Sequence, residues 1–504
     1  MSPSQPAGRS ALTADLPARI AASSPSVLVL GDALLDVWLT GESRRLCREA
    51  PVPVIDVNCR HSAPGGAANT AVNFAALGAD VTLVAVLGDD QEAGLLRRLL
   101  SAAGVRSTGL VVDPGWRTPV KQRLVAGDAL VARYDTTPQR PPGRAAAQAT
   151  VTAFDAALRA DPATAVVVVD YGLGTLVPAL AEELSRRRAE LALLVVDAHE
   201  LGGWAPLRPD LVTPNVAEAA VLLDSPPLSL APGGGDRITR FAARREALLA
   251  ATGAESVALT ADRDGALLLT GSAGVVHRTW AEPAPELQAA GAGDAFVAAL
   301  TLGTVTGLEP ASAIELAQAA ADVAVRRPGT SVCTSAALAD RLRSHRAALL
   351  DDRELARLVA EHRDAGRRIV FTNGCFDVLH RGHVAYLSQA KQLGDVLIVA
   401  VNDDASVRRL KGESRPVNPV LDRVAVLAAL SCVDHVAVFT EDTPARLIKL
   451  VRPDAYAKGG DYTPEMLPET PLVRSLGGQV HVLDYLPDRS TTRIVNRIRA
   501  GTSG

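Results

Sequence analysis

The sequence predicts an α/β fold arranged as two successive domains. Short apolar runs of strand type alternate with segments whose apolar residues recur at helical spacing. Glycine-rich turns follow several of these runs, and a chain of 504 residues is too long for one typical domain. Alternation of this kind favours a central, mostly parallel sheet with helices on both faces.

Composition narrows the class of protein. Hydrophobic residues make up 48% of the chain and charged residues 21%, which are globular values. A net charge of −4 gives no reason to expect nucleic-acid or membrane binding. The five cysteines are an odd number without a C-x-x-C pair, which argues against a disulfide framework and a zinc site. We expect a cytoplasmic protein without a signal peptide or membrane span.

Changes in composition along the chain suggest its boundaries. Residues 1–24 are rich in Ser, Pro and Ala and are expected to form a flexible tail. The first domain is predicted over residues 25–343 and the second over residues 366–504. Between them, residues 344–365 are charged with helical periodicity and are interpreted as a connector.

The first domain opens with a buried-strand pattern at residues 27–30, and a glycine-started helix is predicted after residue 66. Later strands are predicted at residues 81–87, 166–169, 193–196 and 211–213, and a hairpin at residues 257–260 and 266–270. Residues 225–236 are rich in Pro and Gly and are interpreted as an exposed loop.

Polar residues gather at the predicted strand ends of this domain. Asp32, Asp36 and Asn69 fall at strand ends or a helix start, and Gly65 and Gly66 lie beside them. Taken singly, each is explained by a turn or a helix cap. As a cluster they favour a ligand site, because open α/β sheets bind ligands there and these groups suit the hydroxyls of a sugar.

A second glycine-rich stretch indicates phosphate chemistry. In AAGAGDAF, Gly291 and Gly293 allow a tight turn, and Asp294 begins a helix. Unpaired N–H groups at a helix N-terminus hold an anion, while a neighbouring carboxylate can take a proton from a hydroxyl. A helix-capping aspartate is the plainer explanation. The chain has no Walker A motif, so a kinase of this type needs another phosphate-binding device.

The second domain is organised around residues 369–383, IVFTNGCFDVLHRGH. A strand is predicted at residues 369–372, a turn at Asn373 and Gly374, and a helix after His383. His380 and His383 therefore lie at a helix N-terminus, a position that suits a phosphate. Two ordinary surface histidines are the alternative. Lys411, Arg423 and Lys458 follow strands and are expected to face a triphosphate, although each alone is explained as a surface charge.

The motif order of the first domain resembles the ribokinase-like (PfkB-type) sugar kinases, whose short β-lid often dimerises. This resemblance implies that the enzyme uses ATP and Mg²⁺, that Asp294 is the catalytic base, and that Glu218 acts on Mg²⁺ indirectly. The lid would correspond to residues 52–56 and 120–134. The implied ATP-binding residues are Asn215, Val216, Ala217, Glu218, Gly291, Ala292 and Gly293. The implied sugar-binding residues are Asp32, Asp36, Gly65, Gly66, Asn69, Lys121, Arg123 and Arg133.

The H-x-G-H stretch of the second domain resembles the cytidylyltransferase-like nucleotidyltransferases. This resemblance implies a Rossmann-like α/β domain in which His380, His383 and Lys411 stabilise the α-phosphate during transfer. The implied nucleotide-binding residues are Asn373, Gly374, Phe376, Asp377, Arg423, Lys458, Gly460, Asp461, Ser490, Thr491 and Thr492.

Both halves together resemble the bifunctional heptose kinase/adenylyltransferases of ADP-heptose biosynthesis, through stretches such as GDALLD, PGGAAN, GAGD, TNGCFDVLHRGH and KGGDY. The resemblance implies phosphorylation of D-glycero-β-D-manno-heptose 7-phosphate at C1, then adenylyl transfer to the 1-phosphate. The chain departs from the family pattern at Cys47-Arg48, at Ala198-His199 and at Ala290.

Three other functions remain open. The kinase could be fused to a cytidylyl- or guanylyltransferase that acts on a different sugar phosphate, since base identity is read by loops that the sequence does not rank. One half could have lost catalysis, although Asp294, His380 and His383 are retained. The chain could also be a structural or interaction protein whose glycine loops have no catalytic role. Two complete motif sets in order argue against this alternative.

Overall fold

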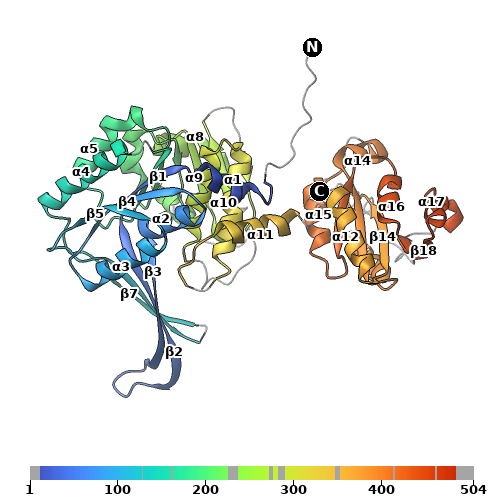
Figure 1. The fold of residues 1–504 in the computed structure, drawn as a ribbon, viewed down its shortest axis with the longest axis horizontal. Coiled ribbons are helices and arrows are strands. Elements are labelled where there is room, and N and C mark those ends of the chain that lie inside the picture. The colour runs from blue at the N-terminus through green and yellow to red at the C-terminus, as the bar shows by residue number, and fades with distance from the viewer. Residues whose placement is uncertain are drawn as a thin grey trace, which may run out of the picture. The chain divides into compact units, whose positions relative to one another are not determined.

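The structure is a computed structural model that describes residues 12–127, 129–160, 163–224, 237–271, 276–281, 290–327, 329–346, 352–412, 415–459 and 463–483. The chain forms two compact units, Met1–Leu342 and Arg343–Gly504 (Figure 1). Within the described ranges, no helix combines the length and apolarity needed to cross a lipid bilayer.

A nine-stranded sheet forms the centre of the first unit. All neighbouring strands are parallel except for the β11–β12 and β12–β13 pairs, which confirms the predicted mostly parallel sheet and the predicted hairpin. In spatial order the strands are β13 (Val276–Arg278), β12 (Ala266–Thr270), β11 (Ser256–Thr260), β10 (Leu211–Val212), β9 (Leu194–Ala198), β8 (Ala165–Asp170), β1 (Ser26–Gly31), β4 (Asp80–Leu87) and β5 (Arg106–Val112).

Helices cover both faces of this sheet because alternate strand residues are apolar on both sides. Val27 and Val29 of β1 belong to one buried cluster, and Leu28 and Leu30 belong to the other. The first cluster is closed by α1 (Leu16–Ser23), α2 (Ala67–Ala76), α3 (Gln91–Ala102), α9 (Ala292–Val305), α10 (Pro310–Ala324) and α11 (Ser335–Arg346). The second is closed by α4 (Arg144–Ala160), α5 (Pro178–Arg187), α6 (Val216–Leu222), α7 (Arg237–Ala243) and α8 (Arg245–Thr252).

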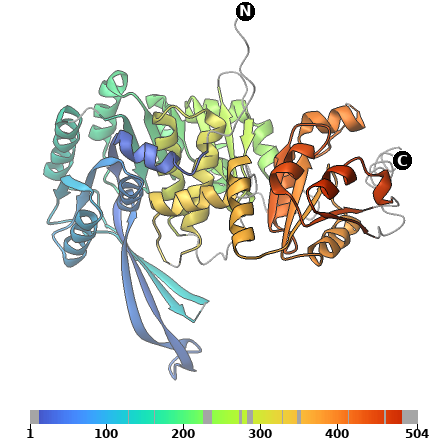
Figure 2. The same ribbon diagram turned by 45° about the vertical axis from the view of Figure 1, so that its right-hand side comes forward.

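A second, four-stranded sheet projects from the first unit and forms the lid (Figures 1 and 2). Its order is β3 (Pro53–Gly66), β2 (Ala33–Leu46), β6 (Val120–Ala126) and β7 (Ala129–Thr136). The predicted lid was too small, because no strand was predicted over residues 33–46. Asp36 consequently lies inside a strand rather than at a strand end.

Part of the predicted N-terminal tail is helical. Helix α1 begins at Leu16, and its Leu16 and Ile20 side chains are buried in the core. The apolar residues of this short amphipathic segment are spaced four apart, so they lie on one face and pack against the first unit. The flexible-tail prediction is therefore wrong for residues 16–23.

The second unit has one five-stranded sheet in which all strands are parallel, as the Rossmann-like prediction requires. Its order is β16 (His435–Phe439), β15 (Val396–Asn402), β14 (Ile369–Gly374), β17 (Ala455–Gly459) and β18 (Gln479–Leu483). One face packs on α12 (Asp352–Asp364), α16 (Ala445–Val451) and α17 (Thr470–Ser475), and the other on α13 (Arg381–Lys391) and α15 (Val420–Ala428).

Three local predictions in this unit are corrected. Asn373 and Gly374 continue β14 instead of forming a turn, because both pair with β15. Helix α14 (Asp404–Lys411) includes the start of residues 409–419, a basic polar stretch for which the sequence predicts a loop. Helix α12 is not a detached connector, because its Leu355 is buried in the core of the second unit.

Candidate active sites

Asp294 lies in the first turn of α9 and is buried. Its carboxylate accepts hydrogen bonds from Asn69 Nδ2 at 2.6 Å and from Thr70 Oγ1 at 2.7 Å, both on α2. These bonds favour the ionised form, but burial outweighs them and raises the pKa of Asp294 to about 6. The group is therefore mostly ionised at neutral pH and still basic enough to accept a proton.

Glycines make this close approach possible. A Cβ atom at Gly291, where φ is +87°, would lie 2.7 Å from the Ser331 carbonyl oxygen and 2.9 Å from Asn69 Nδ2. At Gly65 it would lie 2.6 Å from Asp36 Oδ2. Any side chain at either position would displace a polar group of the site.

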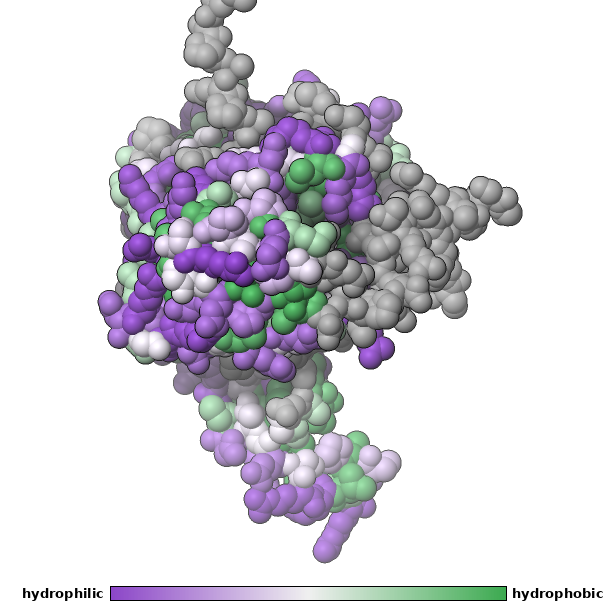
Figure 3. All heavy atoms as spheres, turned by 90° about the vertical axis from the view of Figure 1, so that its right-hand side faces the viewer, coloured by the Kyte–Doolittle hydropathy of each residue, from purple (hydrophilic) through white to green (hydrophobic). Residues whose placement is uncertain are grey.

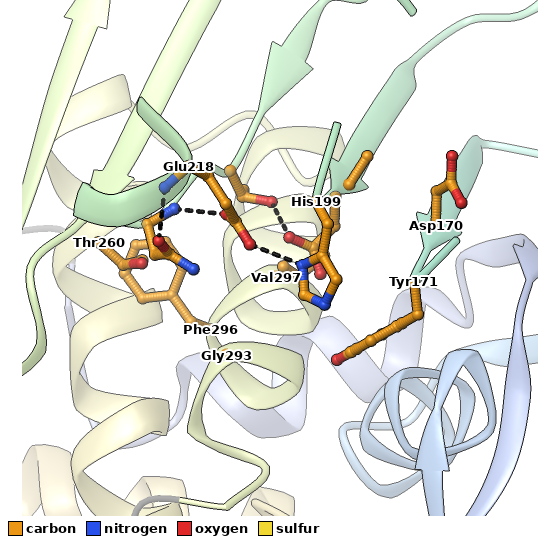
Figure 4. Close-up of a pocket in the computed structure, with 12 residues that line it drawn as sticks. Asp170, Tyr171, His199, Glu218, Thr260, Gly293, Phe296 and Val297 are labelled. Atoms are coloured by element: carbon orange, nitrogen blue, oxygen red, sulfur yellow. Dashed lines mark hydrogen bonds and ion pairs between the residues drawn. The ribbon is translucent and has the colours of Figure 1, made fainter. Parts of the chain in front are cut away.

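A pocket opens beside the N-terminal turn of α9 (Figure 4). It is lined by the ends of β8, β9 and β10, the start of α6, and the first turns of α9. The lining residues are Asp170, Tyr171, Asp197, Ala198, His199, Thr213, Asn215, Glu218, Thr260, Gly293, Phe296 and Val297. The predicted ATP residues Asn215, Glu218 and Gly293 thus come together in one pocket, as expected for the carboxyl ends of parallel strands. We call it the ATP-side pocket.

The N-x-x-E motif builds a reciprocal helix cap. Asn215 Oδ1 accepts the Glu218 N–H at 2.9 Å, and Glu218 Oε2 accepts the Asn215 N–H at 2.8 Å. The other Glu218 oxygen lies 2.7 Å from Nδ1 of His199, and this contact raises the pKa of His199. Both oxygens of Glu218 are thus engaged by protein groups.

Asp197 is a third acidic group of the ATP-side pocket. Burial raises its pKa to about 7, although a hydrogen bond of 2.9 Å from Thr213 Oγ1 opposes the shift. Sequence reasoning did not select Asp197, Thr213, Tyr171 or Thr70. The position of Asp197 directly after a predicted strand was a usable signal, whereas the contact of Thr70 with Asp294 spans 224 residues and left none.

A second pocket lies on the lid side and is called the sugar-side pocket. Its lining residues are Leu34, Pro119, Val120, Lys121, Arg133, Asp135, Thr136, Thr137, Tyr171, Leu173 and His199. The Lys121 Nζ atom lies 4.4 Å from the centre of the Tyr171 ring, and Arg133 donates to Asp135 at 2.6 Å. Lys121 and Arg133 thus line a common pocket, and their charges suit a phosphate.

The two aspartates predicted to bind the sugar, Asp32 and Asp36, form hydrogen bonds with other groups of the protein. Contrary to the prediction, Asp32 is fully buried, and its carboxylate accepts the N–H groups of residues 171, 173 and 175 at 2.9–3.0 Å. It therefore shapes the loop after β8. Asp36 is bound by Arg123 at 2.7 Å and by Thr330 at 3.0 Å, and Arg123 also stacks on Trp38. This cluster joins the base of the lid to the segment after α10.

In the second unit, His380 caps α13, because its Nδ1 atom accepts the Gly382 N–H at 3.1 Å. The centres of the His380 and His383 rings are 4.1 Å apart, and Phe376, with φ +45°, packs against His383. Burial, followed by the charges of His380 and Lys411, lowers the pKa of His383 to about 4. Nδ1 of His383 is buried without a hydrogen-bond partner among the described residues. His383 is thus a neutral histidine with a buried nitrogen that no described residue satisfies.

Lys458 was predicted to follow a strand, but it lies inside β17. Its Nζ atom donates to Asn373 Oδ1 at 3.1 Å, and the Tyr456 hydroxyl donates to the same oxygen at 2.7 Å. Burial lowers the pKa of Lys458. The two donors fix the Asn373 carboxamide at the carboxyl end of β14. Lys411 is the last residue of α14 and is exposed.

Arg423 and Asp377 are positioned differently from the prediction. The side chain of Arg423 is 1% exposed, and it donates to the Cys375 and Asn418 carbonyl oxygens and to Asp404. Asp377 is buried, pairs with Arg415 and accepts the Val417 N–H at 2.6 Å. Both hold the loops around the histidines and do not face open space. Gly460, Asp461, Ser490, Thr491 and Thr492 lie outside the described residues.

Replacing Arg423 with methionine is expected to lower the free energy of unfolding of the second unit by about 3–5 kcal/mol, because buried partners lose their donor. The measurement is the unfolding transition of the second unit in urea. Arg409→Met is the control, since Arg409 is half exposed in its pair with Asp442, and should change stability by about 0–1 kcal/mol. Unchanged stability with a raised KM for ATP would restore the predicted phosphate contact for Arg423.

Comparison with known proteins defines the class. Residues 24–337 match the pfkB family of carbohydrate kinases, and residues 371–497 match the cytidylyltransferase-like family. The first unit also has the fold of Escherichia coli phosphofructokinase-2, with a TM-score of 0.51 and 17% identity over 64% of this chain and 99% of that one. The molecule is therefore a carbohydrate kinase joined to a nucleotidyltransferase.

Similarity along nearly the whole chain identifies the family. The chain is 40% identical to the bifunctional protein HldE of Alkalilimnicola ehrlichii over 94% of its length and 97% of that protein. It is 38% identical to the HldE protein of Nitrosococcus oceani over 95% of its length and 98% of that protein. It is 35% identical to the HldE protein of Citrifermentans bemidjiense over 95% of its length and 97% of that protein. The chain belongs to the HldE family of bifunctional proteins, the heptose kinase/adenylyltransferases.

Proposed function

We propose that the first unit phosphorylates D-glycero-β-D-manno-heptose 7-phosphate at C1 with ATP. The second unit then transfers AMP from ATP to D-glycero-β-D-manno-heptose 1-phosphate, giving ADP-heptose and pyrophosphate. The observation that carries this proposal is the pairing of two phosphate-handling sites in a chain that aligns with HldE proteins over about 95% of its length.

In the kinase reaction, Asp294 takes the proton from the C1 hydroxyl group of the sugar. The oxygen of that hydroxyl group attacks the γ-phosphorus of ATP. The bond from that phosphorus to the bridging oxygen breaks, and ADP leaves. The hydrogen bonds from Asn69 and Thr70 aim the carboxylate, and the N–H groups at the start of α9 hold the phosphoryl oxygens. Lys121 and Arg133 bind the 7-phosphate in the sugar-side pocket.

In the transferase reaction, the heptose 1-phosphate oxygen attacks the α-phosphorus of ATP, and pyrophosphate leaves. A phosphate oxygen is already ionised, so the step needs no general base. His380 and His383 stabilise the charge that grows on the α-phosphate, and the fixed Asn373 carboxamide lines the same strand end. Lys411 adds a positive charge near the histidines, as its effect on His383 indicates.

Mg²⁺ fits the kinase site as a water-bridged ion. This cation prefers oxygen ligands and keeps several waters, and the ATP-side pocket offers the carboxylates of Asp197 and Glu218. Mg²⁺ would neutralise the charge of the phosphates, with Glu218 holding it through water because both of its oxygens are engaged. We also propose that the enzyme works in the cytoplasm.

We also propose a homodimer through the lid. Six large apolar side chains of the lid are 38–64% exposed, namely Leu46, Val52, Val57, Leu130, Val131 and Tyr134. In Figure 3 hydrophobic side chains are visible on the projecting lid sheet. A monomer seldom leaves so many apolar groups of one small element in water.

The variant Val57→Asp combined with Leu130→Asp is expected to be monomeric, because two buried charges per subunit would oppose association. Light scattering after size-exclusion chromatography measures the mass. Met466→Asp, which changes an exposed residue of the second unit, is the control and should leave the mass unchanged. A wild-type mass of about one chain, 52.5 kDa, would contradict the dimer proposal.

The proposed function is tested with purified protein, ATP, Mg²⁺ and synthetic heptose 7-phosphate, with products followed by phosphorus NMR. The 1,7-bisphosphate should form first. ADP-heptose should appear only after a separate phosphatase removes the 7-phosphate. Consumption of ATP with another sugar phosphate, but not with heptose 7-phosphate, would refute the heptose assignment while keeping the two reaction types. Use of CTP or GTP instead of ATP would refute the adenylyl assignment.

A further inference from the structure

The ATP-side and sugar-side pockets share two residues, Tyr171 and His199. In the proposed kinase reaction the phosphoryl group leaves ATP in one pocket and joins the sugar in the other. A side chain that lines both pockets therefore lies beside the path of the phosphoryl group. Tyr171 is largely used as a packing surface, because the Lys121 ammonium group lies over its ring and His199 meets the ring edge to face, with centroids 4.8 Å apart.

The His199 ring is fixed by two contacts, and one of its nitrogens remains able to donate a hydrogen bond. It follows the end of β9, and its side chain is 56% exposed. The contact of 2.7 Å with Glu218 fixes Nδ1, and the contact with Tyr171 fixes the ring plane. In Figure 4 the ring stands between Glu218 and Tyr171, and its second nitrogen points away from Glu218, toward the side where Tyr171 and Gly293 lie. Nε2 is thus left for a ligand in the shared space.

The surrounding groups explain why such a donor is useful there. Asp197 and Glu218 make this side of the ATP-side pocket acidic, and an acidic lining repels phosphate oxygens. Lys121 supplies positive charge from the sugar side. Among the described residues that line both pockets, His199 carries a ring nitrogen, and it lies between the acidic side of the ATP-side pocket and Lys121.

We propose that His199 is a phosphoryl-binding residue of the kinase site, held by Glu218 and directed by Tyr171 toward the group in transfer. This inference rests on the proposed function of the first unit. It predicts a contact that strengthens as the phosphoryl group moves between the pockets, so removal of the side chain should lower kcat more than it raises KM.

The test compares His199→Ala, His199→Gln and His199→Lys with wild type in steady-state phosphorylation of heptose 7-phosphate. His199→Ala should lower kcat about 10- to 100-fold with KM for ATP changed less than about 3-fold, as expected for loss of one transition-state contact. His199→Lys and His199→Gln, which keep an N–H donor, should recover part of the loss. Adenylyl transfer to heptose 1-phosphate by the same preparations is the internal control and should stay at the wild-type rate.

Two results would overturn the inference. One is an unchanged kcat in His199→Ala. The other is a raised KM for ATP with no change in kcat, which would make His199 a nucleotide-binding residue only. A drop that neither His199→Lys nor His199→Gln reverses counts against a donor role as well. Wild-type turnover of heptose 7-phosphate is measured first and tests the proposed function by itself. The His199 inference is judged by the ratio of variant to wild type, on whichever sugar phosphate the wild type accepts.

An independent readout comes from the nitrogen NMR signals of histidine-labelled protein, assigned by comparison with His199→Gln. The Nε2 signal of His199 should shift when a non-hydrolysable ATP analogue and heptose 7-phosphate are added together, and shift less with either alone. No shift in the ternary complex would contradict the proposed contact.

Discussion

Asp294→Asn is expected to lower kcat for heptose phosphorylation by about 10²- to 10⁴-fold, the usual contribution of a general base. The amide has nearly the same volume as the carboxylate and can still bond to Thr70, so the site should keep its shape. It cannot take the C1 proton. The measurement is ADP release in the presence of heptose 7-phosphate, with adenylyl transfer in the second unit as the internal control.

The pH profile gives the same prediction a second form. Because burial raises the pKa of Asp294 to about 6, kcat/KM of the kinase should fall about tenfold per pH unit below that value as the base becomes protonated. The sign for stability is opposite. Between about 4 and 6 the folded state binds the proton more tightly than the unfolded state, so this group makes folding less favourable as pH rises through that window. Asp294→Asn should abolish this destabilisation.

Glu190→Gln is a matched control, because Glu190 is a carboxylate of the same unit outside both pockets. It should leave the kinase rate unchanged. A rate in Asp294→Asn within about threefold of wild type would show that another group takes the proton, and Asp197 would then be the next candidate.

His383→Ala is expected to lower kcat of adenylyl transfer by about 10²- to 10³-fold, the usual cost of removing one donor to a charged transition state. Burial keeps this ring neutral at pH 7, so its contribution is a hydrogen bond from a fixed position rather than a full charge. The measurement is pyrophosphate release with heptose 1-phosphate and ATP. Heptose phosphorylation by the same protein should not change.

His362→Ala is the control for this second variant. His362 is a partly buried histidine of the same unit that contacts His435 and not the α13 histidines. It should retain the wild-type adenylyl transfer rate. If His383→Ala and His362→Ala lost activity equally, the effect would come from general destabilisation of the unit, and the catalytic assignment would fail.

The sequence by itself determined the fold class, the two-domain order and several functional positions. Strand periodicity and glycine placement predicted the central sheet of each unit, because apolar strand patterns reflect which faces are buried. Local motifs also placed Asp294 and His383 at helix starts, since the signals for a helix start lie in neighbouring residues. The long strand β2 was missed, because its exposed outer half lacks an apolar pattern.

Tertiary structure decided which polar side chains face a ligand and which hold the protein together. Asp32 and Arg423 resemble binding residues in sequence, yet both are buried and bonded to backbone groups. Thr70 belongs to the site because it contacts Asp294, and His199 belongs to it because it contacts Glu218. Neither contact is between neighbours in the sequence. The physical reason is that burial and hydrogen-bond partners arise when distant segments pack, so the local sequence does not show how a polar side chain is engaged.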